Sequence, residues 1–396
     1  MVKICHIITT FYKNSGSARR TLMVARDLVK KGHTVHLIVG KDASERLIDT
    51  CRLEGLTIFR FSNLVKYISP KDDFLAFLKL VKTLSKERYD IVHTHLAKAG
   101  IIGRFAAKTA NVKIVIHTVH GPTFSIPNLL QRKLFLFLEK MASRCTDKIL
   151  FVGKELCDTY IKNNVTSNRK ASIIYTGRDF KQFEDALRLD RKEILDTRKQ
   201  CGIKPDDIVI GYVARIVPSK GHEMAIRACK IAADRFPKIK MIFIGRANLQ
   251  SEQKHKTRLQ KLAVELEIEN NIYFLDYQPE IAQFYRIMDA FILPSLYEGL
   301  PNVLIEAIFM GLPVLSFKCD GVKEVLDLCP GAGYTIPQRH HRALAKELVH
   351  LMAQLPVSTE NPLDHTRLIK KIWNIDTMLQ SKSRLYNDLI VRKHLL

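Results

Sequence analysis

The chain has 396 residues, 46% of them hydrophobic, and its 63 lysines and arginines against 40 aspartates and glutamates give a formal net charge of +23. The length exceeds one ordinary core and predicts two domains of about 150–200 residues, while eight scattered cysteines without a CxxC pair exclude a disulfide framework and indicate a reducing cytosol. No apolar run approaches the ~18 residues that span a membrane, and the positive excess favours lipid headgroups, nucleic acid or phosphorylated substrates as partners.

The first half of the sequence alternates apolar strands with helices. It begins with a strand and a polar loop, residues 14–17, which is not the pattern of a signal peptide. A helix over residues 19–31 follows, and Gly32 predicts its left-handed end. Continuous apolar strands separated by helices predict a parallel sheet covered on both faces. The strands expected here are residues 3–9, 34–39, 57–61, 91–94, 113–118, 148–152 and 171–175.

The same alternation restarts after a polar, charged segment, residues 188–204, that predicts a linker with a short helix. Two doubly wound domains in series predict a deep cleft between the carboxyl ends of their sheets. The strands expected in the second half are residues 208–214, 240–244, 272–275, 290–293, 313–316 and 333–336. The predicted organisation is an N-terminal domain (1–180), a linker (181–205), a second domain (206–365) and a C-terminal helical segment (366–396) packing back toward the first domain.

The most informative stretch is S-L-Y-E-G-L-P-N-V-L-I-E-A, residues 295–307. It follows a buried strand, and Pro301 predicts a helix start because its missing N–H would be unpaired there. The free amides of the first turn form a site for phosphate. Glu298 in the loop and Glu306 inside the helix flank this turn. Two carboxylates around an anion site suit a diphosphate between two polyhydroxylated parts, as in a nucleotide sugar.

Two cations follow another buried strand, in G-Y-V-A-R-I-V-P-S-K-G, residues 211–221. Together with the E-x7-E spacing of Glu298 and Glu306, this pattern resembles the retaining nucleotide-sugar glycosyltransferases of family four, over nearly the whole chain. That family has the GT-B fold of two facing Rossmann-like domains. The resemblance assigns ribose to Glu306 and the donor sugar to Glu298, with Gly299, Leu300, Pro301 and Asn302 also in the donor site. Without the resemblance, a helix-start acid and a solvated loop acid would be the plainer interpretation.

Arg215 and Lys220 look like the family's strand-end cations, which grip the donor diphosphate. Fixed cations in a dry site stabilise the charge of the leaving group, and losing one such group costs ~10²–10³ in rate. The alternative is a solvated surface loop. Because these cations would replace magnesium, the sequence predicts no metal and no cofactor besides the nucleotide-sugar substrate.

His120 in I-H-T-V-H-G-P, residues 116–122, resembles the family's active-site histidine, which reaches the donor sugar. Packing in a turn is the alternative. His93 and His95 share one face of a strand end and, with His117 and His120, would suggest a metal site. No third-ligand spacing supports that site, so we expect no zinc.

The loop Ser15-Gly16-Ser17 departs from the two adjacent glycines that relatives carry, although Gly16 remains a candidate for the donor site. Arg19 and Arg20 would reach an acceptor phosphate or cap the following helix. Residues 174–179 resemble the family's Y-N-G-V-D segment, with Thr176 and Arg178 as substitutions, and we interpret them as structural.

Two basic amphipathic segments, residues 64–88 and 127–148, predict association with an anionic membrane surface. Arg132 and Lys133 in the second would face the membrane or the acceptor. The alternative is a pair of core-facing helices with solvated basic sides.

The predicted function is a bacterial-type retaining glycosyltransferase at the inner face of the cytoplasmic membrane. It would move a sugar, from a UDP-sugar by family expectation although GDP-mannose users share the motifs, to a lipid-linked glycan in polysaccharide or lipopolysaccharide biosynthesis. A nucleotide-sugar 2-epimerase of the same fold, a catalytically silent relative and a basic nucleic-acid-binding protein are the alternatives. No nucleic-acid module supports the last.

Overall fold

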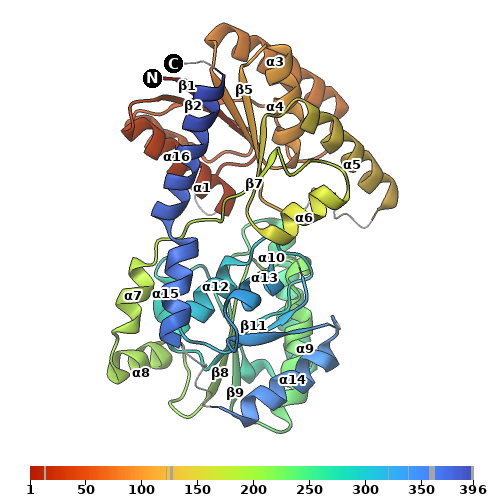
Figure 1. The fold of residues 1–396 in the computed structure, drawn as a ribbon. Coiled ribbons are helices and arrows are strands. Elements are labelled where there is room, and N and C mark those ends of the chain that lie inside the picture. The colour runs from red at the N-terminus through yellow and green to blue at the C-terminus, as the bar shows by residue number, and fades with distance from the viewer. Residues whose placement is uncertain are drawn as a thin grey trace. The chain divides into compact units, whose positions relative to one another are not determined.

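The computed structural model describes residues 1–12, 15–121, 123–124, 128–319, 321–337, 339–355 and 362–393. The chain forms two compact units, one of Met1–Arg178 with Ile375–Leu396 and one of Asp179–Asn374. Each unit is a parallel sheet with helices between successive strands (Figure 1). No helix among the described residues is both long and apolar enough to cross a membrane.

The first unit holds a seven-stranded parallel sheet in the order β3-β2-β1-β4-β5-β6-β7. The strand order reverses between β1 and β4, and doubly wound folds bind ligands at such a point. In this register His6 lies opposite His93. The strands are β1 (Lys3–Ile8), β2 (Thr34–Val39), β3 (Thr57–Arg60), β4 (Ile91–His95), β5 (Ile114–Val119), β6 (Lys148–Phe151) and β7 (Ala171–Ile173).

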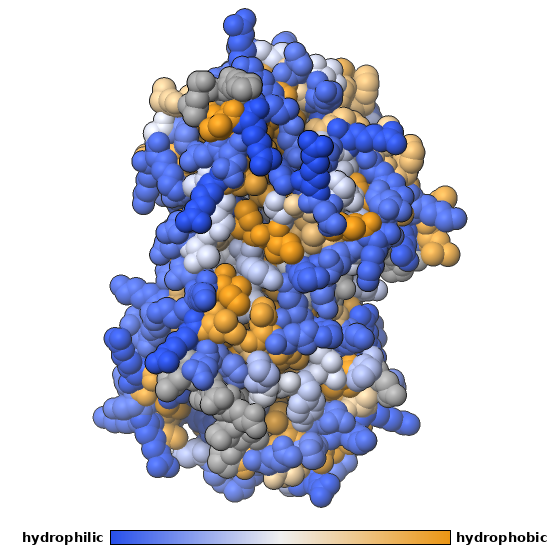
Figure 2. Space-filling model, viewed as in Figure 1, coloured by the Kyte–Doolittle hydropathy of each residue, from blue (hydrophilic) through white to orange (hydrophobic). Residues whose placement is uncertain are grey.

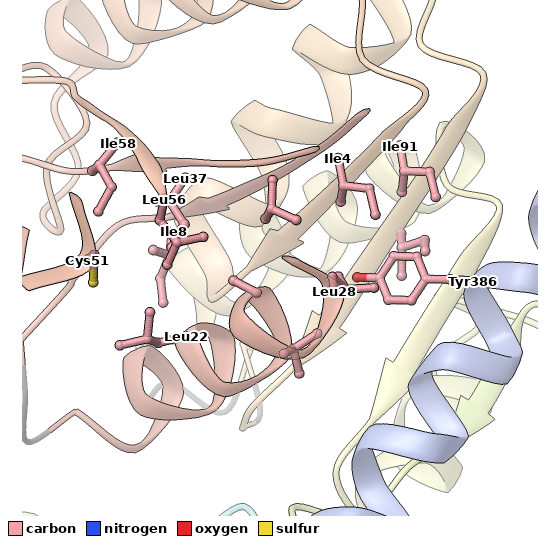
Figure 3. Packing of buried hydrophobic residues seen from close by; sticks show 14 of the residues in the cluster. Ile4, Ile8, Leu22, Leu28, Leu37, Cys51, Leu56, Ile58, Ile91 and Tyr386 are labelled. Atoms are coloured by element: carbon pink, nitrogen blue, oxygen red, sulfur yellow. The ribbon is translucent and has the colours of Figure 1, made fainter. Parts of the chain in front are cut away.

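The helices of the first unit are α1 (Gly16–Lys30), α2 (Glu45–Leu53), α3 (Pro70–Glu87), α4 (Ala97–Thr109), α5 (Leu129–Arg144), α6 (Lys154–Lys162) and α16 (Ile375–Arg392). The last of these comes from the end of the chain and packs beside α1. Figure 3 shows Tyr386 reaching from α16 toward Leu28 and Ile91, in a core cluster that includes Ile4 and Ile8. The C-terminal helix therefore completes the core of the first unit.

The second unit holds a six-stranded parallel sheet in the order β10-β9-β8-β11-β12-β13. Its order reverses between β8 and β11. The strands are β8 (Ile208–Val213), β9 (Ile239–Ile244), β10 (Ile272–Leu275), β11 (Ala290–Leu293), β12 (Val314–Phe317) and β13 (Gly333–Ile336). The helices are α7 (Lys181–Leu187), α8 (Arg191–Gln200), α9 (His222–Ala233), α10 (Gln250–Glu265), α11 (Ile281–Arg286), α12 (Asn302–Phe309), α13 (Val322–Leu328), α14 (His341–Ala353) and α15 (Pro362–Trp373).

The segment expected as a linker, residues 181–205, instead contains α7 and α8 and lies within the second unit. Arg198 of α8 explains this difference, because its guanidinium donates to the backbone oxygens of Ile287 and Asp207 and pairs with Asp289 at 3.0 Å. These bonds fix α8 to the β8 and β11 edge of the sheet.

The C-terminal helical segment divides in two at Asn374. Helix α15 belongs to the second unit, whereas α16 belongs to the first. The backbone N–H of Ile375 donates to the carbonyl of Arg178 at 3.1 Å, so the chain re-enters the first unit where it had left it.

Helix α1 begins at Gly16, three residues before the predicted start. Ser15 is its N-cap and accepts a bond from the Ala18 N–H. The expected loop therefore contributes its glycine to the first turn of the helix; its first residue, Asn14, lies outside the described residues.

Candidate active site

The turn after β11 in the second unit carries Glu298, and the helix that follows this turn carries Glu306. Helix α12 begins at Asn302, and Pro301 is its N-cap with φ −77°. The predicted role of Pro301 as the first helical residue is thus off by one position. The first-turn amides of a helix attract anions. Gly321 packs against this turn, and a Cβ there would lie 2.3 Å from the Gly299 carbonyl oxygen.

Glu306 lies inside α12 and is 2% exposed. The hydroxyl of Tyr285, on α11, donates to its Oε2 at 2.9 Å. A buried carboxylate requires such donors, because an unpaired one would carry a large desolvation cost. This bond holds the carboxylate in orientation, and a carboxylate is a group that can accept bonds from vicinal hydroxyls.

Lys220 and Glu298 form the central ion pair of the site, with Nζ and Oε1 2.5 Å apart and both side chains largely buried. Lys220 ends the short 3-10 turn Pro218–Lys220 after β8. The Tyr212 hydroxyl donates to the Lys220 backbone carbonyl, which fixes this turn on its own strand. The sequence reasoning predicted both residues as donor ligands, and the structure brings them together.

The loop after β8 also contacts the loop after β11 directly. The Leu296 N–H donates to the Ser219 carbonyl at 2.9 Å. Gly221 has φ +71°, and a Cβ there would lie only 2.0 Å from the Pro294 carbonyl oxygen. Only glycine suits this combination of backbone angle and close approach. The Lys220–Glu298 pair is therefore held from both sides by backbone contacts.

Arg215 lies apart from that pair. Its side chain is 65% exposed, with Nη1 3.9 Å from Oε1 of Glu252. Glu252 itself accepts from the backbone N–H groups of Asn248 and Leu249 before α10. The structure thus provides one fixed cation, Lys220, and one exposed arginine near the same strand end.

His120 follows strand β5 in the first unit, and the residue is partly buried. Its Nε2 lies 3.2 Å from Nδ1 of His95, and its Nδ1 is buried without a partner among the described residues. Burial, then the charges of Arg20 and Lys382, hold the pKa of His120 well below its usual range. The imidazole is therefore neutral near pH 7, with one nitrogen left for a ligand.

His6, not His117, completes the histidine group predicted around His93 and His95. One nitrogen of each of His6, His93 and His95 lies within 4.8 Å of the others. His117 projects to the opposite face, where its Nδ1 lies 2.9 Å from the Thr94 hydroxyl. The sequence offered no spacing for a third ligand, and the structure supplies His6 as a third histidine through the pairing of β1 with β4.

Hydrogen bonds between neutral groups account for this group of histidines. His95 Nε2 lies 3.0 Å from His6 Nδ1, while the two nitrogens of His93 face the hydroxyls of Tyr386 and Thr118 at 2.5 and 2.7 Å. Every nitrogen of His93 and His95 thus has a hydrogen-bond neighbour. Metal independence itself remains a prediction.

Arg20 folds back along α1, so that a Cβ on Gly16 would lie 3.3 Å from its Nη1. Arg19 is exposed on the same helix. Arg132 and Lys133 are exposed on α5, beside the exposed side chains of Leu129 and Leu130. Pro122 of the histidine motif and Pro127 before α5 lie outside the described residues.

Three further residues complete these clusters and were missed from the sequence. They are Tyr285 beside Glu306, His6 beside His95, and Lys382, which is 5% exposed on α16. Each lies outside the motifs, and tertiary packing alone brings it to them. For His6, the available signal was a histidine inside the first apolar strand.

Comparison with known families gives two matches that together span most of the chain. Residues 193–380 match the model described as "Glycosyl transferases group 1", and residues 14–182 match "Glycosyltransferase Family 4".

Individual proteins of known name or structure are similar to this chain over most of its length. The UDP-Gal:alpha-D-GlcNAc-diphosphoundecaprenol alpha-1,3-galactosyltransferase of Escherichia coli is 28% identical over 348 residues, 86% of each chain. The capsular polysaccharide biosynthesis glycosyltransferase CapM of Staphylococcus aureus is 24% identical and covers 76% of this chain and 78% of its own. The crystal structure of Anabaena HepE with UDP and glucose has a TM-score of 0.77 at 17% identity, covering 98% of this chain and all of that one (100%). The last likeness concerns the fold, and it confirms the predicted two-domain α/β fold of the GT-B class.

Proposed function

The chain belongs to the family 4 glycosyltransferases, and we propose that it moves a sugar from a UDP-sugar to a lipid-linked glycan acceptor in cell-envelope polysaccharide biosynthesis. The observation that carries this proposal is the paired set in the second unit, Lys220 with Glu298 and Glu306 with Tyr285, around the start of α12. This set offers a cation and helix amides to a diphosphate and carboxylates to hydroxyl groups.

The proposed donor pose follows from these contacts. Glu306 accepts from the two ribose hydroxyls, and the diphosphate lies over the first turn of α12. Lys220 then exchanges Glu298 for the phosphate, which releases Glu298 to accept from hydroxyls of the donor sugar. An ion pair at 2.5 Å that opens on binding keeps both groups positioned before the ligand arrives.

The proposed reaction retains the anomeric configuration. The acceptor hydroxyl attacks on the face from which the diphosphate departs, the bond from the anomeric carbon to the phosphate oxygen breaks, and the departing phosphate takes the hydroxyl proton. Lys220 stabilises the charge on the leaving group, with Arg215 as the second cation. These side chains would take the place of magnesium.

The relatives support the acceptor class. The E. coli relative acts on a GlcNAc-diphosphoundecaprenol, as its name states, and the S. aureus relative serves capsular polysaccharide biosynthesis. We propose that the first unit binds the acceptor, with His120 as a neutral hydrogen-bonding group.

We further propose that α5 and α3 rest on an anionic membrane surface. The apolar side chains of α5 are turned outward, with Leu129 71% and Leu130 78% exposed beside Arg132 and Lys133. Figure 2 shows apolar atoms at the edge of the first unit where Figure 1 places α5. Phe74 and Leu78 are likewise exposed on α3. Core packing, the alternative interpretation of these helices, does not account for such exposure.

The test of membrane binding is flotation with vesicles containing anionic lipid. The double variant Leu129→Ser/Leu130→Ser should lose most binding, whereas Leu53→Ser, which alters an exposed leucine on α2, should not. Equal binding by all three proteins would remove α5 from the proposal.

The test of the reaction is a mass-spectrometric donor screen. The protein is incubated separately with UDP-glucose, UDP-galactose, UDP-N-acetylglucosamine, UDP-N-acetylgalactosamine and GDP-mannose, with and without a bacterial lipid extract. We expect one donor to release its nucleotide in the presence of lipid and to give a lipid product heavier by one sugar. An epimerised donor formed without lipid would contradict the proposal and favour the epimerase.

A further inference from the structure

Two buried hydroxyl groups, those of Tyr212 and Ser295, connect the strand that leads to Lys220 with the loop that carries Glu298. Tyr212 lies on β8 and Ser295 follows β11, and both residues are 0% exposed. Their side-chain oxygens are 3.1 Å apart. Buried hydroxyls need hydrogen-bond partners, because leaving one unpaired costs free energy of desolvation. The two strand ends are therefore joined through side chains as well as through the backbone.

The direction of the hydrogen bonds at Tyr212 follows from the chemistry of its partners. A tyrosine hydroxyl has one proton, and Tyr212 donates it to the Lys220 backbone carbonyl, which can only accept. The Tyr212 oxygen therefore accepts its other bond from the Ser295 hydroxyl. Burial raises the pKa of Tyr212 well above its usual range, so the phenol keeps this proton. The result is a hydrogen-bond series that runs from Ser295 through Tyr212 to the backbone of Lys220.

Aromatic packing fixes the ring of Tyr212. The ring centroid lies 4.8 Å from that of His222 and 6.1 Å from that of Phe243. His222 is 1% exposed, and neither of its nitrogens has a hydrogen-bond partner within the described part of the chain. The imidazole thus supports the tyrosine ring by packing, while the hydroxyl is used for Lys220 and Ser295. This packing keeps the hydroxyl at the turn.

The turn that ends at Lys220 depends on such external contacts. It is a single 3-10 turn of three residues, Pro218–Lys220, and hydrogen-bond geometry in such turns is poorer than in an α-helix. In the proposed donor pose Lys220 leaves Glu298 for the diphosphate, so the ion pair no longer holds the turn against the β11 loop. The bonds from Ser295 to Tyr212 and onward do not involve the ammonium group. They therefore remain when the ion pair opens.

We propose that Tyr212 and Ser295 are positioning residues for sugar transfer, which hold the Lys220 ammonium at the leaving diphosphate once its pair with Glu298 has opened. This inference rests on the proposed function, because it takes Lys220 as the cation of the leaving group. A displacement of about 1 Å at a reacting group can cost ~10²-fold in rate. The two hydroxyls therefore affect turnover although neither touches the substrate in the proposed pose.

The test measures sugar transfer by the full chain with the donor found by the screen. The variants are Tyr212→Phe and Ser295→Ala, each alone and each combined with Lys220→Ala. The control is Tyr273→Phe, which removes another tyrosine hydroxyl of the same sheet, on β10, that donates to the Gly202 carbonyl at 3.2 Å. Thermal unfolding verifies that each variant folds. If Tyr212→Phe does not fold, Ser295→Ala carries the same test, because it keeps the bond from Tyr212 to Lys220.

We expect kcat to fall about tenfold or more in Tyr212→Phe, because the turn that carries Lys220 is then free to shift. The loss in Ser295→Ala should be smaller, since Tyr212 still donates to the turn. Neither substitution should lower kcat further in the Lys220→Ala background, because the group that they position is absent there. Tyr273→Phe should keep the wild-type kcat. Equal fold losses with and without Lys220, or an unchanged kcat in both single variants, would overturn the positioning role.

A measurement without substrate separates this inference from the proposed function. Hydrogen–deuterium exchange reports on the Leu296 amide, which donates to the Ser219 carbonyl inside the turn at 2.9 Å. We expect this amide to exchange faster in Tyr212→Phe and at the wild-type rate in Tyr273→Phe. If the wild type transfers sugar from no donor, the proposed function fails, whereas faster exchange in Tyr212→Phe still supports its hold on the turn. Exchange at the wild-type rate in Tyr212→Phe would overturn that hold.

Discussion

The two units carry their candidate ligand groups in opposite electrostatic states. In the second unit, Lys220 and Glu298 neutralise each other, and Glu306 is held by Tyr285. In the first unit, Arg20 and Lys382 have no carboxylate partner among the described residues; the charges of Arg178 and Arg19 act on Arg20, and buried histidines lie near Lys382. The second unit is thus complete without a ligand, whereas the first lacks an anion.

This difference indicates two ways of preparing a site. A ligand of the second unit must exchange partners with an existing ion pair, which favours specificity because an incorrect ligand leaves a charge unpaired. The first unit has no such ion pair at Arg20 or Lys382 among the described residues, so removing either cation leaves no carboxylate unpaired. Variants that remove single groups should therefore have opposite consequences in the two units.

The largest effect is expected for Lys220→Ala. We expect turnover to fall by ~10²–10³ because the leaving diphosphate loses its fixed cation, while the fold is retained. Steady-state transfer assays with the donor found by the screen measure this, with Lys254→Ala, an exposed lysine of α10, as the control. Near-normal transfer by Lys220→Ala in a linear assay would refute the leaving-group role.

Because of the buried histidines of the first unit, the free energy of unfolding should decrease as the pH is lowered. Burial is the main cause that lowers their pKa values, to about 3 for His6, so the folded state keeps them neutral. Below about pH 6.5 the unfolded chain binds protons that the folded chain does not, so stability is full above that pH and falls as pH decreases. Each group contributes up to about 1.4 kcal/mol per pH unit.

Urea unfolding at a series of pH values between 7 and 5 measures this dependence. The variant His6→Asn should show a shallower slope than the wild type. An identical slope, or stability that rises on acidification, would contradict the assignment of neutral buried histidines.

Lys382→Met should stabilise the free protein, which is unusual for removing a charged residue. Burial and the charge of Arg20 lower the pKa of Lys382 to about 7. Between that pH and the ordinary pKa near 10.5, the unfolded chain binds a proton that the folded chain lacks, so wild-type stability rises with pH in this window. The variant should lose this rise and be more stable at pH 7.

Thermal unfolding at pH 7 and pH 9 checks this prediction, with Arg384→Met as the control. A lower melting temperature for Lys382→Met at pH 7 would show that the lysine has a stabilising partner after all.

The smallest effect is expected for Tyr285→Phe, which removes one hydroxyl from Glu306. A hydrogen bond to a charged group contributes about 1.5–3 kcal/mol, but the ribose hydroxyls replace part of it. We expect UDP affinity to fall no more than tenfold, and less than in Glu306→Gln. Calorimetric titration of UDP into both variants measures the two losses of affinity. A larger loss in Tyr285→Phe than in Glu306→Gln would contradict the assignment of Glu306 to ribose.

Local pattern was sufficient to predict the strands and to place Lys220 and Glu298 in loops of one predicted donor site, and the structure shows them paired. Both residues follow buried parallel strands, and the carboxyl ends of such strands meet at one edge of a sheet. The strand pairing of β8 with β11 therefore places the two loops side by side.

Local sequence pattern did not predict which strands are neighbours in the sheet, nor that the end of the chain packs into the first unit. His6 lies beside His93 and His95 because β1 pairs with β4, and the sequence of neither strand indicates this pairing. Lys382 and Tyr386 reach the first unit because the chain returns to it at Ile375. Residues with these roles look like any buried tyrosine or helix lysine in the sequence.

The most direct test of the account is hydrogen–deuterium exchange of the full chain with and without UDP. The account predicts protection of the β8 loop to Gly221 and of the segment from Ser295 into α12, where the amides of the first turn would meet phosphate. A Lys220→Ala variant should show weaker protection at the same UDP concentration. Protection elsewhere, with both of these segments unchanged, would contradict the assignment of the nucleotide to the second unit.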